Sequence, residues 1–190
     1  MVDFNEKIKR LRAILGGPQR RIAVVTHTNP DGDAVGSSLA WAEILRGFGH
    51  EVALVVPNRY PSFLDWMDGI DRIIVAKENP DAAVEAVSRA ELVFVMDLNK
   101  TDRLEAVSDA LATNTEAKRI LFDHHLSPPD EYDLQFSYPH LCSTSYITYN
   151  VISALCGHEA ITVSIAENLY AGIMTDTGNF AFSFLTPDLM

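Results

Sequence analysis

Short apolar runs rich in β-branched residues alternate along this chain with longer segments of helical spacing. The apolar runs lie at 21–26, 51–56, 72–76, 92–96 and 119–122. Helical spacing of apolar residues is found in 3–15, 34–48, 80–89, 101–111, 144–156 and 162–175. Strands that alternate with helices typically form a parallel sheet covered on both faces. We therefore expect an α/β fold with a mostly parallel five-stranded sheet and helices on both faces; residues 134–137 could add a sixth, shorter strand.

The length and composition suit a single domain. Apolar residues make up 47% of the 190 residues, which is enough to bury a full core. No uninterrupted apolar run approaches the roughly 20 residues that a membrane span needs. Charged residues such as Lys7 and Arg10 interrupt any signal-peptide core near the N-terminus. We expect a cytoplasmic protein with no membrane partner.

The charge balance limits the choice of partner. The formal net charge is -11, and the few Lys and Arg residues do not form a basic face. Binding to long duplex nucleic acid is therefore disfavoured, since neutralising a phosphate backbone requires such a face. A small anionic substrate is compatible with this charge if metal cations supply the positive charge.

The first cluster of polar residues follows the strand expected at 21–26 and precedes a helix. It contains His27, Asp31 and Asp33, three potential metal ligands within seven residues, and Pro30 and Gly32 favour a tight turn between them. A purely structural role is the alternative, in which Asp33 caps the helix and Asp31 belongs to the turn. The histidine at the strand exit favours metal binding.

Two further clusters also stand at strand ends. Asp97 directly follows the apolar run 92–96, and the triplet Asp123, His124 and His125 follows the run 119–122. Open α/β sheets bind ligands at the carboxyl ends of their strands. A surface turn or a polar loop would be the alternative explanation. Asp123 can orient a histidine through its second ring nitrogen, as partners of metal ligands do.

A fourth acid, Asp176, closes the last apolar helix just before Gly178. An acid is poorly placed at a helix C-terminus unless a cation lies nearby, although a solvated last turn is the alternative. Together the candidate ligands are oxygen and imidazole, with no cysteine, which suits Mn²⁺ or Mg²⁺ better than structural zinc. Five or six ligands fit two ions bridged by one carboxylate.

The order of these motifs resembles the DHH phosphoesterase superfamily, from about residue 20 to 185. The motif from Asp31 to Ser37 is similar to the branch of oligoribonucleases (nanoRNases) that also act as pAp phosphatases, and to cyclic-dinucleotide phosphodiesterases. The resemblance implies two Mn²⁺ ions, with Mg²⁺ or Co²⁺ as substitutes. It implies one ion held by His27, Asp31 and Asp97, and the other by Asp33, Asp97, His124 and Asp176. His125 would contact the phosphate or the leaving oxygen, and Asp123 would orient the histidine pair.

The function that follows is hydrolysis of short oligonucleotides or pAp to mononucleotides by a hydroxide that two metal ions activate. Cyclic-dinucleotide phosphodiesterase and manganese-dependent inorganic pyrophosphatase are alternatives within the same chemistry, as is single-strand DNA exonuclease. A non-catalytic nucleotide-binding module is the alternative from another class. Relatives of this branch carry a C-terminal substrate-binding domain, and we expect residues 1–190 to be the catalytic domain alone. A homodimer is one oligomeric state left open.

Overall fold

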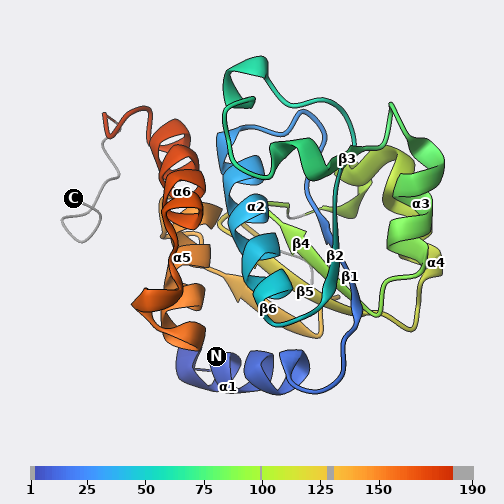
Figure 1. The fold of residues 1–190 in the computed structure, drawn as a ribbon, viewed down its shortest axis with the longest axis horizontal. Coiled ribbons are helices and arrows are strands. Elements are labelled where there is room, and N and C mark those ends of the chain that lie inside the picture. Colours follow the sequence, from blue (N-terminus) through green and yellow to red (C-terminus); the bar gives the residue numbers. More distant parts are fainter. Residues whose placement is uncertain (1–2, 99, 128–130, 182–190) are drawn as a thin grey trace.

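A six-stranded, fully parallel sheet forms the centre of the protein (Figure 1). The structure is a computed structural model that describes residues 3–98, 100–127 and 131–181. The strand order is β3-β2-β1-β4-β5-β6. The strands are β1 (Arg21–Val25), β2 (Glu51–Val56), β3 (Ile73–Val75), β4 (Leu92–Met96), β5 (Lys118–Asp123) and β6 (Leu134–Ser137). This confirms the predicted α/β class.

The predicted count of five strands is wrong by one. The sixth strand, β6, pairs in parallel with β5 through Ile120 and Leu134, and through Phe122 and Phe136. It has four residues, of which only Leu134 and Phe136 are buried. So short a run on a sheet edge carries little periodicity of its own, and pairing with β5 decides its conformation.

Helices cover both faces of the sheet. They are α1 (Phe4–Leu15), α2 (Gly32–Gly47), α3 (Pro80–Ser88), α4 (Ser108–Thr113), α5 (Thr144–Cys156) and α6 (Val163–Asp176). One apolar core joins the sheet to α1, α2, α5 and α6, and a second joins its other face to α3 and α4. Figure 1 shows α2, α5 and α6 together on one side and α3 and α4 on the other. No helix among the described residues is long and apolar enough to cross a membrane.

The larger core is organised around aromatic rings. The ring of Trp41 on α2 lies 5.4 Å from that of Phe94 and 4.9 Å from that of Phe122, and Phe122 lies 4.9 Å from Phe136. All five residues of β4 are buried. Burial on both faces explains the continuous apolar runs in the sequence, since every residue of β1 after Arg21 and every residue of β4 is buried.

The helix predicted at 101–111 is not continuous. A 3₁₀ segment, η3 (Thr101–Val107), precedes α4, and Glu105 has φ 45° and ψ -114° inside it. The Glu105 carboxylate accepts a hydrogen bond of 2.7 Å from Thr28 Oγ1 and lies 3.0 Å from Lys77 Nζ. These contacts tie the segment to the loop after β1, and such tertiary ties override helical spacing.

Candidate metal centre

The polar residues that follow β1, β4 and β5 meet at one edge of the sheet, because all the strands are parallel and end on the same side. Three sets of potential ligand atoms lie there, each within 4.8 Å of one another. The sets are His27, Asp31 and Asp97; Asp33, His124 and Asp176; and Asp97, His124 and His125. The structure thus brings together the six residues expected to hold metal and His125.

Asp97 belongs to two of these sets and lies next to His124, which belongs to the third. Its Oδ2 lies 3.4 Å from His27 Nε2, and its Oδ1 lies 3.5 Å from His124 Nε2. The residue has a positive φ of 57° directly after β4, and its N–H donates to the carbonyl of Phe122 at 2.8 Å. This turn directs a carboxylate that is only 2% exposed toward both histidines.

The tautomer of His27 follows from its hydrogen bonds. Its Nδ1 lies 2.8 Å from the carbonyl oxygen of Thr28, which can only accept, so Nδ1–H donates. In the neutral ring Nε2 then carries a lone pair, which faces Oδ2 of Asp97. Burial lowers the pKa of His27, but Asp97 and the Thr28 carbonyl outweigh burial and raise that pKa overall. The two facing atoms require either a proton or a metal cation between them, and this arrangement fits a metal ligand.

Asp31 has a structural role at the start of α2 and also lies in one of the potential ligand sets. Its Oδ1 accepts hydrogen bonds of 3.0 Å from the N–H groups of Asp33 and Ala34, so it is the N-cap of α2. Its second carboxylate oxygen takes no part in this cap. From the sequence, Asp33 was considered as the helix cap. In the structure Asp31 is the N-cap of α2 instead, because Asp33 lies inside the first turn of the helix.

Asp33 is fully buried against the N-terminus of α5. Its Oδ2 accepts from the N–H of Thr144 at 2.6 Å, and its Oδ1 accepts from the N–H of Ser145 at 2.7 Å. Burial raises the pKa of Asp33 well above its usual range, and the carboxylates of Asp97 and Asp176 raise it further. The N–H groups and the positive end of the helix dipole hold this carboxylate in place.

The opening of α5 holds a second acid of the centre. The hydroxyl of Thr144 donates a hydrogen bond of 2.9 Å to Oδ1 of Asp97. Ser143 caps the helix by accepting from the N–H of Tyr146 at 3.0 Å. The sequence predicted a helix at 144–156. It gave no sign that the start of this helix contacts the acids, because 111 residues separate Asp33 from Thr144.

His124 and Asp176 complete the second ligand set. His124 Nε2 lies 3.3 Å from Oδ2 of Asp176 and 4.0 Å from Oδ2 of Asp33. Burial raises the pKa of Asp176 to about 6, against the opposing effect of His124. Asp176 is the last residue of α6, so its position depends on how α6 packs on α2. The helix dipole disfavours an acid there unless a cation is bound.

Glycines allow α2 and α6 to approach closely. A Cβ at Gly32 would overlap the side chain of Thr175, and a Cβ at Gly36 would overlap the carbonyl of Asn168. A Cβ at Gly172 would overlap the hydroxyl of Ser145 on α5. The spacing between the helices that carry Asp33 and Asp176 therefore depends on residues without side chains.

His125 is oriented by Asp123. The two side chains are joined by a 2.7 Å hydrogen bond between His125 Nδ1 and Asp123 Oδ1. The Asp123 carboxylate raises the pKa of His125 more than burial lowers it. Asp123 is fully buried, whereas the side chain of His125 is 36% exposed. This leaves Nε2 of His125 to contact a molecule that reaches the centre from solvent.

The donor set fits divalent cations. The carboxylates and imidazoles converge at this edge, and oxygen with nitrogen donors suits Mn²⁺, Mg²⁺ and related ions. Asp97, which lies next to both His27 and His124, has a pKa below its usual value. Burial would raise the pKa of Asp97, but His27 and His124 lower it overall. An ionised, buried carboxylate between two sets of ligands is suited to bridging two cations.

The comparisons with known proteins agree with this geometry. The sequence profile of the DHH family, N-terminal domain, matches residues 21–173. The chain is 30% identical over 185 residues to the bifunctional oligoribonuclease and PAP phosphatase NrnA of Thermus thermophilus, covering 97% of this chain and 52% of that protein. It is 28% identical over 163 residues to a probable manganese-dependent inorganic pyrophosphatase of Enterococcus faecalis, covering 83% and 48%.

A solved structure shows the same fold. The exopolyphosphatase-related protein from Bacteroides fragilis superposes with a TM-score of 0.93 at 31% identity, covering 99% of this chain and 55% of that one. The chain thus spans about half the length of the curated relatives it matches.

Proposed function

The chain belongs to the DHH family, and from this premise we propose that it is the catalytic domain of a metal-dependent phosphoester hydrolase acting on short oligonucleotides and pAp. The observation that carries the proposal is the position of the Asp97 carboxylate, 3.4 Å from His27 in one ligand set and 3.5 Å from His124 in the other. The resemblance to an oligoribonuclease and PAP phosphatase over 97% of the chain supports the choice of substrate.

Two divalent cations, with Mn²⁺ preferred, are proposed to bind at this centre. One would be held by His27, Asp31 and Asp97, and the other by Asp33, Asp97, His124 and Asp176. When bound, such ions supply positive charge to phosphoryl oxygens and lower the pKa of a water molecule. This charge would also offset the net charge of -11, which otherwise repels an anionic substrate.

The protein's own contribution to the chemistry is orientation and proton handling. The N-terminus of α5 fixes Asp33 and Asp97 through Thr144 and Ser145, so these carboxylates are aligned before substrate arrives. Asp123 holds His125 by Nδ1, which leaves Nε2 to donate a proton to the leaving oxygen or to contact a phosphoryl oxygen. We propose His125 as a catalytic residue and Asp123 as its positioning residue.

Other substrates of the same chemistry are cyclic dinucleotides, pyrophosphate and single-stranded DNA. In the sequence, Gly32 and Gly36 belong to the motif that is similar to the oligoribonuclease branch. In the structure both glycines lie where α2 contacts α6, so they serve helix packing. The likeness to a probable manganese-dependent pyrophosphatase therefore keeps pyrophosphate among the substrates to test.

Part of the substrate site is proposed to lie outside this chain. The relatives are about twice as long, which leaves room for the C-terminal substrate-binding domain that the family resemblance implies. Metal binding and orientation of the phosphate would belong to the domain described here. Recognition of the nucleotide would then depend largely on the second domain.

Two measurements test the proposal. Calorimetric titration should show two Mn²⁺ ions per chain, and Asp97→Asn should reduce this uptake, because it removes the shared carboxylate charge. Hydrolysis of pApA, pAp, cyclic di-AMP and pyrophosphate should then be compared with Mn²⁺, with the same variant as control. A chain that takes up no Mn²⁺, or hydrolysis that Asp97→Asn leaves unchanged, would refute the assignment. Nucleotide binding without the uptake of two Mn²⁺ ions would favour the non-catalytic module.

A further inference from the structure

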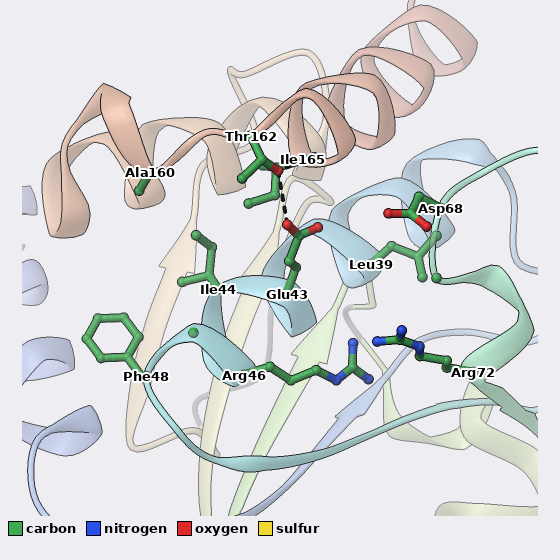
Figure 2. A pocket seen from close by; sticks show the side chains of 12 residues that line it. Leu39, Glu43, Ile44, Arg46, Phe48, Asp68, Arg72, Ala160, Thr162 and Ile165 are labelled. Atoms are coloured by element: carbon green, nitrogen blue, oxygen red, sulfur yellow. Dashed lines mark hydrogen bonds between the residues drawn. The ribbon is translucent and has the colours of Figure 1, made fainter.

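A cavity of about 630 Å³ lies far from the metal centre along α2. It is bounded by the C-terminal half of α2, by the turn before β3 and by the start of α6 (Figure 2). The metal centre lies at the N-terminus of α2, which has 16 residues and is therefore about 24 Å long. The cavity is thus a separate site, and no ligand of the metal centre lines it.

Two arginines converge in this cavity. Figure 2 shows the guanidinium groups of Arg46 on α2 and Arg72 pointing toward each other. Among the described residues neither forms an ion pair, whereas Arg21, Arg59 and Arg89 do. Burial, and to a smaller extent the neighbouring Arg72, lower the pKa of Arg46, whereas Glu43 acts in the opposite direction.

The acids that line the cavity do not pair with these arginines. Glu43 accepts hydrogen bonds from the hydroxyls of Thr162 at 3.0 Å and Ser164 at 2.9 Å, at the N-terminus of α6. Asp68 lines the cavity but forms no ion pair with either arginine. Figure 2 shows Glu43 turned toward Thr162 and away from the arginine pair. An anion from solution could therefore satisfy both guanidinium groups.

The remaining walls of the cavity are apolar. Leu39, Ile44 and Ile165 line it together with Phe48, whose ring is 42% exposed. Its volume is in the range of small-molecule sites, which combine apolar walls with a few polar groups that fix orientation. A ligand suited to it carries an anionic group for the arginines and an apolar or aromatic group for these walls.

We propose that this cavity binds a nucleoside monophosphate, with the phosphate between Arg46 and Arg72 and the base along the apolar wall. Guanidinium groups bind phosphate oxygens through paired, charge-assisted hydrogen bonds, and two of them can neutralise a phosphate dianion. The ligand would also relieve the repulsion between the two arginines. This inference is independent of the metal centre and of the proposed hydrolysis.

Calorimetry with AMP, adenosine and inorganic phosphate tests the site, in EDTA so that the metal centre plays no part. AMP should bind more tightly than either of the other two molecules. Arg72→Gln and Arg46→Gln should each weaken AMP binding about tenfold, the value of a charge-assisted hydrogen bond pair. Arg72 is exposed and its side chain makes no hydrogen bond among the described residues, so its variant should fold normally. Arg46 also donates to the carbonyl of Val52 at 3.2 Å, so its variant needs a thermal melt as well.

The matched control is the double variant Arg10→Gln with Arg89→Gln. Both residues are exposed, they lie on α1 and at the end of α3, and the pair changes the net charge more than either single variant does. The control should bind AMP like the parent chain. The proposal is overturned if AMP does not bind, or if Arg72→Gln binds it unchanged. Equal binding of adenosine would exclude the role of the phosphate, and equal binding of inorganic phosphate would exclude the role of the apolar wall.

Discussion

The hydroxyl of Thr144 donates a 2.9 Å hydrogen bond to Asp97, the carboxylate that lies between His27 and His124 of the metal centre. The backbone N–H of the same residue donates to Asp33 at 2.6 Å. One residue at the opening of α5 therefore orients two acids that come from different parts of the chain. The side-chain and backbone contacts of Thr144 can be separated by substitution.

Thr144→Val should lower Mn²⁺ affinity about 10- to 100-fold, the usual cost of removing a partner that orients a metal ligand. Valine keeps the shape of threonine and leaves the backbone bond to Asp33 intact. Thr144→Ser retains a hydroxyl and should bind Mn²⁺ nearly as the parent chain does. Calorimetric titration of the three proteins measures this. Equal affinity of the valine variant and the parent chain would show that Asp97 needs no such support.

Gly36→Ala should destabilise the protein by about 1–3 kcal/mol, as overpacking of a close contact usually does. A Cβ at Gly36 would overlap the carbonyl of Asn168 on α6, whereas one at Gly47 would meet nothing within 4 Å. Gly47→Ala is the matched control on the same helix and should be neutral or slightly stabilising. Urea unfolding compares the two. Mn²⁺ affinity should also fall in Gly36→Ala, because displacement of α6 moves Asp176; unchanged affinity would show that the carboxylate does not depend on this packing.

Without metal, Asp176 should make the protein less stable as the pH rises. Its pKa is raised by burial to about 6 in the folded state, above the usual value of 3.8, so the folded protein binds more protons between these values. Stability therefore falls as pH rises through this window. Asp176→Asn should remove this contribution, so its stability advantage over the parent chain should grow from pH 4 to pH 7, measured by urea unfolding in EDTA. A constant difference between the two proteins would contradict the assignment.

Replacing His125 with alanine should lower kcat by about 10²- to 10⁴-fold, the usual contribution of a proton donor or acceptor. The uptake of two Mn²⁺ ions should be retained, because His125 is not among the proposed ligands. Asp123→Asn should shift the pH dependence of kcat toward lower pH, since the carboxylate raises the pKa of His125. The kcat of each variant is to be measured with the substrate that the parent protein hydrolyses fastest. Undiminished kcat in His125→Ala would exclude its catalytic role.

The sequence determined the parallel sheet and the position of three polar clusters on it. Apolar runs that are buried on both faces leave a local signal, and the first polar residue after each run lies at the carboxyl edge of a parallel sheet. His27, Asp97 and the triplet from Asp123 to His125 follow from this rule alone. The assignment of individual ions to these residues came from the family resemblance and remains a proposal.

Only the tertiary structure decided how the helices complete the centre. Which acid caps α2, how Thr144 reaches Asp97 and how Asp176 meets His124 depend on contacts between residues far apart in sequence. The same holds for β6, which pairing with β5 stabilises, and for the arginine pair of the cavity. Hydrophobic periodicity fixes which face of a helix is buried, whereas the angle and distance at which two helices meet depend on the packing of both surfaces together.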